Sequence, residues 1–512
     1  MMLQDTLTRS AESTPDAALL LSGGETSTYG SVEAASNQMA RLLIDLGVQR
    51  GERVVLLIPN SLRYVISYYA ALKSGAIVVP LHFMSDARTV RAVLEDCAAS
   101  VVIAAPGAIA RIPAAAEVPS LKAVVAPDED VPSFAAAGPL RAVAESAASS
   151  FSTELPVQRR GIDIDRALII YTSGSTARPR GATLSHLNVV ANTRSILSYL
   201  QLARKDRVLV VLPFSYVYGA SLLHTHVAAG GSLSLADGML FPNAIVDALE
   251  RDEATGLSGV PSTYAILLNR SELAARPLPA LRYVTIAGGA LPAVHLRKLA
   301  GIAAAPKIYV MYGATEASAR LSYLEPADLD RKMGSIGRAI PNVELTVRRE
   351  DGTEASVGES GEIVARGSNI MAGYWRDPSG TAEVLDEHGF HTGDMAWRDD
   401  EGFFWIVGRK RDFVKAGAFK VSPVEIEETL LESGVVEEAA VIGRRDEYLG
   451  EAIVAYVTLR SGAVATVDDL RRHCQERLAP HKLPAEILVI HSMPRSPSGK
   501  IDKQHLRTLQ ER

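Results

Sequence analysis

Cysteine is nearly absent from this chain, which has only Cys97 and Cys474 among its 512 residues. Two cysteines cannot supply a disulfide framework or a cysteine-rich zinc site. No apolar run approaches the roughly 18 residues that would cross a bilayer. The first residues, MMLQDTLTRSAESTPD, also lack the apolar stretch of a secretory leader. We therefore expect a protein without a membrane span, located in the reducing cytoplasm.

A basic excess is also missing, since 53 lysine and arginine residues face 59 acidic residues and give a net charge of −6. Nucleic-acid binders usually carry a strongly basic surface, so that class is disfavoured. The chain is 47% hydrophobic and 22% charged, as is typical of globular proteins. Its length allows about two to four packed units, and an enzyme is the leading class.

The hydrophobic pattern predicts an α/β fold with parallel-rich sheets. A helical pattern over 31–46 is followed by apolar runs at 54–58 and 77–80, an alternation that indicates strands covered by helices. Residues 104–160 are rich in alanine, serine and proline and suggest an irregular connection. From 334 to 407, short strands and glycine-rich turns predict a small β-barrel section.

A domain boundary is expected near Gly408, dividing the chain into 1–408 and 409–512. The run GRKRDFVKAGAFK has five basic residues and one acidic residue between Arg409 and Lys420. The tail after this run predicts a compact α+β unit of ordinary domain size, with helices at 423–432 and 467–477 and strands at 439–442 and 452–459. This unit is either an ordinary appended domain or a mobile domain whose basic face meets a polyanion.

A loop rich in hydroxyls and glycine covers residues 171–181, with the sequence YTSGSTARPRG. It follows an apolar strand at 167–170 and precedes a helix expected to begin near Ser185, so the pattern predicts a strand–turn–helix. Backbone amides and hydroxyls in such a turn can bind phosphate oxygens. The Walker spacing is absent, and a loop of this composition is often only a loop.

Further motifs follow in a defined order. MYGATE at 311–316 follows a predicted strand at 307–310, at the kind of strand end where open α/β sheets bind ligands. The later segments are GEIVARG at 361–367, GYW at 373–375, HTGD at 391–394, GRKRD at 408–412 and PRSPSGK at 494–500. In this order, from Thr28 to Lys500, the chain resembles the adenylate-forming superfamily of acyl- and aryl-CoA synthetases, luciferases and peptide-synthetase adenylation domains.

The resemblance implies a large N-terminal domain that binds ATP and the acid, and a small mobile C-terminal domain. Three residues of the phosphate loop, Ser175, Ala177 and Arg180, depart from the usual TSGTTGxPKG pattern. Arg180 keeps the positive charge of the usual lysine but has a planar fork. The implied ATP-binding residues are Thr172, Ser173, Gly174, Ser175, Thr176, Arg180, Gly289, Tyr312, Gly313, Asp394 and Arg409. Within this set, Tyr312 is expected to stack on adenine and Asp394 to accept the ribose hydroxyls.

The same resemblance implies three catalytic residues. Thr315 would hydrogen-bond the α-phosphate, and Glu316 would bind Mg²⁺, which prefers oxygen ligands and shared phosphates. Lys500 would bridge the attacking carboxylate and the α-phosphate and neutralise the charge that develops there. A lysine near a chain end is normally a solvated surface charge, and only its PxSxSGK setting favours catalysis.

Alignment with the family also implies an acyl pocket of mostly small, apolar residues, suited to an aromatic ring or an acyl chain. Its residues are Tyr216, Gly219, Ala220, Leu223, Gly259, Thr285, Ala287, Met311, Ala319 and Arg320. Gly219 falls where amino-acid-activating relatives carry an aspartate, which disfavours an α-amino acid because an unpaired buried ammonium is costly. Tyr216 replaces a histidine of many relatives. Arg320 would either pair with an acidic or polar substituent of the substrate or point to solvent.

The predicted function is an ATP-dependent ligase that forms an acyl- or aryl-adenylate, releases pyrophosphate and then forms a thioester with coenzyme A. The alternative is a stand-alone enzyme that loads an aryl, fatty or amino acid onto the phosphopantetheine of an acyl carrier protein. A degenerate nucleotide-binding protein is the third reading. Arg411 is the expected hinge, and Lys415, Gly417 and Lys420 are expected to face the thiol after the small domain turns. The sequence indicates no oligomeric state.

Overall fold

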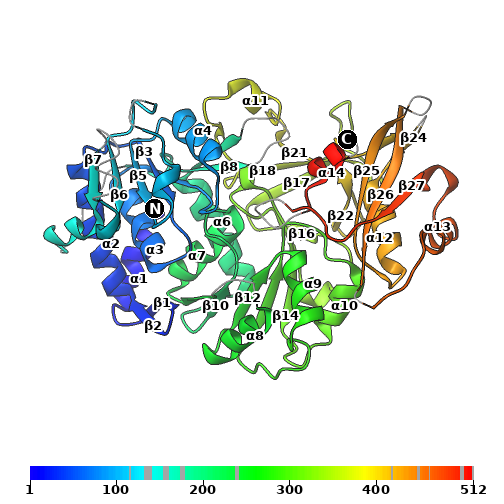
Figure 1. Cartoon of the computed structure of the whole chain (residues 1–512), viewed down its shortest axis with the longest axis horizontal. Coiled ribbons are helices and arrows are strands. Elements are labelled where there is room, and N and C mark those ends of the chain that lie inside the picture. The colour runs from blue at the N-terminus through cyan, green and yellow to red at the C-terminus, as the bar shows by residue number, and fades with distance from the viewer. Residues whose placement is uncertain are drawn as a thin grey trace.

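A computed structural model describes residues 1–114, 117–131, 141–153, 161–172, 179–236, 241–416, 419–446, 450–460, 462–495 and 501–509. Helices cover the faces of sheets built from both parallel and antiparallel strands (Figure 1). This architecture confirms the predicted α/β class with parallel-rich sheets. In the described residues, no helix combines the length and the apolar character needed to cross a membrane.

The first sheet has eight strands in the order β19-β9-β8-β4-β3-β5-β6-β7. Its strands are β3 (Arg53–Leu57), β4 (Ile77–Pro80), β5 (Val101–Ala104), β6 (Ala123–Ala126), β7 (Arg141–Ala144), β8 (Arg166–Thr172), β9 (Arg180–Ser185) and β19 (Gly373–Tyr374). Helices α2 (Tyr29–Asp45), α3 (Leu62–Lys73) and α4 (Ala87–Cys97) pack beside it. Residues 104–160 were predicted to be an irregular connection, and this is wrong because β6 and β7 add two parallel strands there.

The second sheet has nine strands in the order β16-β15-β14-β13-β12-β10-β11-β1-β2. They are β1 (Ala18–Ser22), β2 (Glu25–Thr28), β10 (Arg207–Val210), β11 (Ser232–Leu235), β12 (Gly256–Gly259), β13 (Tyr283–Ile286), β14 (Lys307–Tyr312), β15 (Ser322–Leu324) and β16 (Arg338–Ala339). The accompanying helices are α1 (Asp5–Ser13), α6 (His186–Leu200), α7 (Val217–Ala229), α8 (Pro242–Arg251), α9 (Pro261–Arg270) and α10 (Ala293–Ala300).

An antiparallel sheet occupies the region predicted to be barrel-like, which confirms that prediction. It contains β17 (Val343–Arg348), β18 (Gly361–Gly367), β20 (Leu385–Asp386), β21 (Gly389–Arg398) and β22 (Phe404–Arg409), with the short helix α11 (Pro378–Ala382) preceding β20. The rings of Trp397 and Trp405 stack across β21 and β22 with their centroids 4.3 Å apart.

The C-terminal part forms a separate sheet, drawn in orange and red in Figure 1. It has β23 (Val414–Ala416), β24 (Phe419–Val421), β25 (Val436–Asp446), β26 (Gly450–Leu459) and β27 (Glu486–Val489), with α12 (Pro423–Glu432), α13 (Val467–Gln475) and α14 (Lys503–Leu509). Strand β22 continues to Arg409, which pairs with Asp394 of the preceding sheet. The connection between the two sheets is therefore the turn at 410–413, just after the expected boundary.

The hydroxyl-rich loop lies between two strands. Strands β8 and β9 pair antiparallel, with Ile169 opposite Thr183, and α6 begins only after β9. Ser185 caps this helix by accepting a hydrogen bond from the Asn188 amide at 3.1 Å. The predicted strand at 167–170 and the predicted helix start near Ser185 are confirmed. The segment between them was expected to be a turn only, and this is wrong because residues 180–185 form β9 and pair with the apolar strand β8.

The core contains histidines that remain neutral. His224 on α7 is buried and its Nε2 lies 2.7 Å from the hydroxyl of Tyr68 on α3. Burial lowers the pKa of His224 to about 3 and those of His226 and His186 to about 4. These side chains therefore act as uncharged packing and hydrogen-bonding groups at neutral pH.

Candidate active site

Strand β14 carries two neighbouring side chains that contact different groups. The Met311 Sδ lies 3.1 Å from the Tyr199 hydroxyl and 3.2 Å from Nε of Arg320. The hydroxyl of Tyr312 donates a hydrogen bond to Oδ2 of Asp394 over 2.6 Å. Successive residues of a strand point to opposite faces of the sheet, so β14 has the predicted acyl residues on one side and the predicted nucleotide residues on the other.

Asp394 is held from two directions. Its Oδ1 accepts a hydrogen bond from Nε of Arg409 at 3.0 Å, and Arg409 is its partner across β21 and β22. The attraction of Asp394 raises the pKa of Arg409, while burial and the same carboxylate raise the pKa of Tyr312. Each carboxylate oxygen can accept more than one hydrogen bond, so Asp394 can still receive the two hydroxyls of a ribose. The structure brings these three predicted residues together.

Glu316 lies in a 3₁₀ helix, Thr315–Ala317, that follows β14. Its Oε1 accepts a hydrogen bond from the hydroxyl of Tyr374 on β19 at 2.8 Å. Burial and the Glu316 charge raise the pKa of Tyr374, so the phenol stays protonated and orients the carboxylate. The GYW segment was one of the motifs found in the sequence, but no role was predicted for Tyr374. Its place within that motif could have indicated a functional side chain.

Arg180 on β9 lies beside Tyr374, the residue that binds Glu316. Its guanidinium carbon lies 5.5 Å from the centroid of the Tyr374 ring. It also forms ion pairs with Glu383 at 3.0 Å and with Asp377 at 3.5 Å, and its backbone carbonyl lies 3.4 Å from Oγ1 of Thr172. Arg180 is thus near Glu316, as a phosphate ligand would be, and a phosphate would have to compete with two carboxylates.

Several predicted residues fall outside the described part of the chain. They are Ser173, Gly174, Ser175 and Thr176 of the phosphate loop, Gly417, and Lys500. Lys420 lies on β24, where its backbone is described but its side chain is not, and Lys415 on β23 is exposed. Arg411 is exposed in the turn between β22 and β23, the position expected of a hinge.

Two glycines of the predicted site are in close contact with backbone. A β-carbon added at Gly313 would lie 1.9 Å from the carbonyl oxygen of Ala319. One added at Gly219 would lie 2.0 Å from the carbonyl oxygen of Pro213. This backbone leaves no room for an aspartate at 219, so the absence of one there reflects local packing. The expectation that α-amino acids are disfavoured, which rests on the missing carboxylate at 219, stays a prediction.

Two other glycines are less constrained. A β-carbon at Gly259 would lie 2.8 Å from the side chain of Thr263, and one at Gly289 would lie 3.4 Å from that of Pro261. Both glycines follow strands of the nine-stranded sheet, Gly259 at the end of β12 and Gly289 after β13. They lie at the carboxyl ends of parallel strands, where α/β sheets bind ligands.

The remaining predicted acyl residues are buried: Ala220, Leu223, Thr285, Ala287, Met311, Ala319 and Arg320. Thr285 is bonded to two residues that sequence reasoning missed. Its Oγ1 lies 2.8 Å from the Tyr218 hydroxyl and 2.7 Å from Oγ of Ser258. Tyr218 precedes Gly219 and Ser258 precedes Gly259 in the sequence. Their position beside predicted acyl residues could have indicated that they belong to the same site. We call Tyr199, Tyr218, Thr285, Met311 and Arg320 the acyl cluster.

Tyr216 has a partner from another sheet. Its ring centroid lies 5.5 Å from that of His82, which follows β4. Burial raises the pKa of Tyr216 to about 12 and lowers that of His82. The sequence alone did not indicate this contact between His82 and Tyr216.

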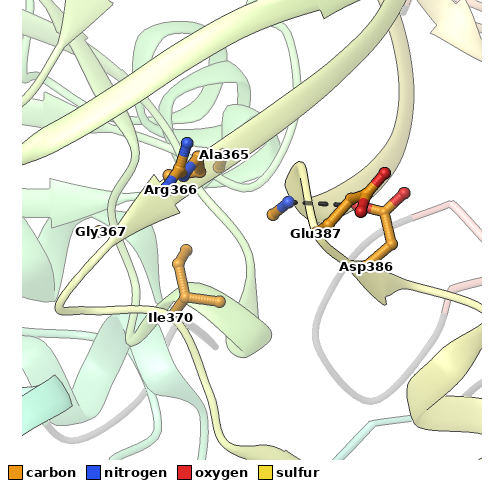
Figure 2. A pocket seen from close by; sticks show the side chains of 7 residues that line it. Ala365, Arg366, Gly367, Ile370, Asp386 and Glu387 are labelled. Atoms are coloured by element: carbon orange, nitrogen blue, oxygen red, sulfur yellow. Dashed lines mark hydrogen bonds between the residues drawn. The ribbon is translucent and has the colours of Figure 1, made fainter. Parts of the chain in front are cut away.

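A cavity of about 310 Å³ lies elsewhere, beside the end of β18 and the β20–β21 turn (Figure 2). It is lined by Ala365, Arg366, Gly367, Ile370, Asp386, Glu387 and Gly389. The dashed line in Figure 2 is the hydrogen bond from the Gly389 amide to Asp386 at 3.2 Å. None of the predicted site residues lines this cavity, and its two carboxylates make it unsuited to a polyphosphate.

The described residues contain one cluster of three acidic groups that could surround a cation, at Asp399, Asp400 and Glu401. Nζ of Lys332 lies 2.6 Å from carboxylate oxygens of both Asp399 and Glu401, and its positive charge offsets the negative charge of this cluster. Glu316 therefore has no ready cage of protein carboxylates in the described part. A single half-buried carboxylate fits Mg²⁺, which usually binds one or two carboxylates together with substrate phosphates and water.

Comparison with known proteins shows the family of this chain. Residues 7–375 match the AMP-binding enzyme family, and residues 425–500 match the AMP-binding enzyme C-terminal domain. The indoleacetate–CoA ligase of Aromatoleum aromaticum is 30% identical over 493 residues, covering 94% of this chain and 93% of that protein. The feruloyl-CoA synthase of an Amycolatopsis species is 32% identical over 502 residues, covering 98% of this chain and 97% of that protein.

Solved structures show the same architecture. The anthranilate CoA ligase AuaEII, in complex with anthranoyl-AMP, superimposes with a TM-score of 0.90 at 25% identity over 99% of this chain and 97% of its own. ATP-bound MatB from Rhodopseudomonas palustris superimposes with a TM-score of 0.88 at 27% identity, over 100% of this chain and 99% of its own. The two family matches together cover most of the sequence. The chain belongs to the AMP-binding enzyme family.

Proposed function

We propose that this chain is an AMP-forming acid–CoA ligase. It joins a carboxylic acid to the α-phosphate of ATP, releases pyrophosphate, and transfers the acyl group from the adenylate to the thiol of coenzyme A. The observation that carries this proposal is the placement of Asp394 between Tyr312 and Arg409, because Tyr312 follows Met311 of the acyl cluster on β14. The relatives named above, which are CoA ligases, support the same reaction.

The residues of the nucleotide side divide the work between them. Asp394 binds the ribose hydroxyls and is held in place by the Tyr312 hydroxyl and by Arg409. Thr315, at the start of the 3₁₀ helix, donates its hydroxyl to the α-phosphate. Arg180 and the loop from Thr172 bind the β- and γ-phosphates, and Arg180 exchanges its carboxylate partners for phosphate oxygens.

Glu316 would hold Mg²⁺, with the Tyr374 hydroxyl orienting its carboxylate. When bound, the ion would neutralise negative charge on the phosphates. Lys500 is the proposed bridge between the attacking carboxylate and the α-phosphate, as the PRSPSGK motif implies. A compact ammonium at that point stabilises charge that builds up in the transition state.

A pyrophosphate-release assay tests the proposal. A panel of aryl, fatty, dicarboxylic and amino acids is offered with ATP and Mg²⁺, and with either coenzyme A or hydroxylamine as acceptor. We expect release with at least one acid and a thioester when coenzyme A is present. No release with any acid would contradict the proposal and favour the degenerate nucleotide-binding reading.

The Lys500→Ala variant is the matched control for this assay. It should lose at least about a thousandfold in adenylation, because the developing charge is no longer neutralised. Formation of the thioester from preformed acyl-AMP should stay nearly normal. Comparable losses in both half-reactions would show that Lys500 has a different role. A phosphopantetheine-bearing carrier protein that replaced coenzyme A with better efficiency would identify the carrier as the acceptor.

A further inference from the structure

Arg320 is a buried cation in the acyl cluster. Only 2% of its surface is exposed, which rules out the solvent-facing alternative considered from the sequence. Its guanidinium carbon lies 4.1 Å from the centroid of the Tyr218 ring. Charged side chains are buried at considerable cost unless a counter-charge or strong hydrogen bonds compensate them. The partners of this guanidinium therefore decide what the site can accept.

No carboxylate within ion-pair distance of Arg320 occurs among the residues that the structure describes. Its Nη1 donates to the backbone carbonyl of Ala319 at 3.1 Å. Its Nε approaches Sδ of Met311 at 3.2 Å, and its Nη2 approaches Oγ of Ser221 at 3.5 Å. A thioether is a weak acceptor and 3.5 Å is long for a hydrogen bond. The further side-chain partner, the hydroxyl of Tyr199, is neutral, so none of these side chains supplies a counter-charge.

The two weak contacts lie on one edge of the guanidinium. Nε and Nη2 point the same way and form the edge that binds a carboxylate through two parallel hydrogen bonds. The third nitrogen, Nη1, is tied to the backbone and fixes the plane of the group. Among the described residues, the edge best shaped for a carboxylate thus meets neutral groups and no carboxylate.

The backbone around Arg320 is held in a strained reversal. Ser318 and Ala319 both have positive φ angles, 56° and 110°, and neither is glycine. The amide nitrogens of Asn192 and Asn369 each donate to the carbonyl of Arg320 at 2.9 Å. Strained backbone persists where the surrounding structure holds it, and it concentrates at functional sites. Here the reversal follows the 3₁₀ helix that carries Thr315 and Glu316 and leads the chain to Arg320.

We propose that Arg320 binds a second carboxylate of the acid substrate. The substrate class is then a dicarboxylic acid, aliphatic or aromatic, of which one carboxylate is adenylated while the other lies on the Nε–Nη2 edge. This inference rests on the proposed ligase function and narrows its substrate. It also supplies a reason for excluding α-amino acids whose ammonium would approach Arg320, because two like charges repel in a buried site.

Matched acids test this in the wild-type enzyme by pyrophosphate release. Adipic acid is compared with its monoamide, and terephthalic acid with 4-carbamoylbenzoic, 4-hydroxybenzoic and 4-(aminomethyl)benzoic acids. We expect kcat/KM for at least one diacid to exceed that of its amide partner by about tenfold or more, with the aminomethyl acid poorest. Amides or hydroxyl compounds that equalled the diacids would overturn the inference while leaving the ligase function intact. No turnover of any acid would instead count against the proposed function itself.

The Arg320→Met variant provides the second arm. It should lose about tenfold or more in kcat/KM on the preferred diacid, change less than about threefold on the matched amide, and keep the KM for ATP. Equal losses on both acids would show that Arg320 only supports the fold or holds the reacting carboxylate. Arg282→Met is the matched control, because Arg282 also lies against a tyrosine ring, 4.9 Å from Tyr283, but is paired with Asp206 at 2.9 Å. If Arg320→Met does not fold, the wild-type comparison of diacid and amide still decides.

Discussion

Tyr312 and Asp394 belong to two different sheets and are joined by a hydrogen bond of 2.6 Å from the tyrosine hydroxyl to Oδ2 of the carboxylate. The contact connects β14 of the nine-stranded sheet to β21 of the antiparallel sheet. A residue expected to stack on adenine thus also orients the carboxylate expected to bind ribose. Its ring and its hydroxyl can be separated by mutation.

Tyr312→Phe keeps the ring and removes the hydroxyl. A hydrogen bond to a charged group contributes about 1.5–3 kcal/mol, and part of this orients Asp394. We expect the KM for ATP to rise about three- to tenfold, with the KM for the acid unchanged. Tyr309→Phe on the same strand is the control, since Tyr309 packs near Tyr199 and away from Asp394. Equal effects of the two variants on ATP would contradict the assignment.

Glu316→Gln should change the requirement for Mg²⁺. A neutral amide is a poorer ligand for a hard cation than a carboxylate. We expect the Mg²⁺ concentration for half-maximal pyrophosphate release to rise at least about tenfold, which corresponds to roughly 1.4 kcal/mol. Tyr374→Phe removes the hydroxyl that orients Glu316 but leaves the carboxylate, so its effect should be about threefold or less. The same Mg²⁺ dependence in both variants would show that Glu316 does not bind the ion.

Arg411→Pro tests the hinge. Proline fixes φ and restricts the turn between β22 and β23, where Arg411 is exposed. We propose that Lys500 and the thiol use the same site in turn, which would require the small domain to rotate between the half-reactions. We expect near-normal pyrophosphate release in a single turnover and thioester formation slower by at least about tenfold, a loss of roughly 1.4 kcal/mol. Arg411→Ala is the control, and equal rates of both half-reactions in the proline variant would place the pivot elsewhere.

His224 should make the protein less stable in acid. Burial lowers its pKa from 6.5 to about 3, so between these values the unfolded chain binds a proton that the folded chain does not. Its stabilising effect is complete above pH 6.5 and is lost as the pH falls toward 3. The slope for one such group is at most about 1.4 kcal/mol per pH unit.

The His224→Gln variant isolates this contribution. It keeps a polar group near the Tyr68 hydroxyl but cannot titrate, so its melting temperature should fall less than that of the wild type between pH 6.5 and 4.5. His505→Gln removes an exposed imidazole and is the control. A pH dependence identical to that of the wild type would assign the acid sensitivity to other groups, such as the buried His186 and His226.

Local sequence patterns predicted the elements whose ends are marked by capping residues. The helix expected at 423–432 has those bounds, because Ser422 caps it and Pro423 occupies its first turn. Strands β6 and β7 were missed since each has only four residues within an alanine-rich segment, which is too short for a clear periodic pattern. The β8–β9 hairpin was missed because residues 180–185 form a strand of only 6 residues that ends where helix α6 begins. A segment this short was interpreted as part of the turn before the helix.

In the candidate site, too, local motifs predicted some residues and tertiary packing determined others. Tyr312, Thr315, Glu316, Asp394 and Arg409 could be named from motifs, because their order along the chain is specific to the family. The bond between Tyr374 and Glu316 joins residues 58 positions apart, and no local pattern encodes it. The burial of Arg320 follows from the packing of α6, α7 and β14 around one turn, which a sequence window does not contain.

The alternation of Met311 and Tyr312 on β14 has a practical consequence for redesign. Under the proposed function, substitutions at Met311 and at its neighbours Arg320 and Tyr218 would alter which acid is accepted without touching the Tyr312–Asp394–Arg409 side. An enzyme with this arrangement can acquire new substrates by a few changes on one face of a strand and keep its handling of ATP. The same separation lets a laboratory library target acid choice alone, with ATP affinity as an internal check on the fold.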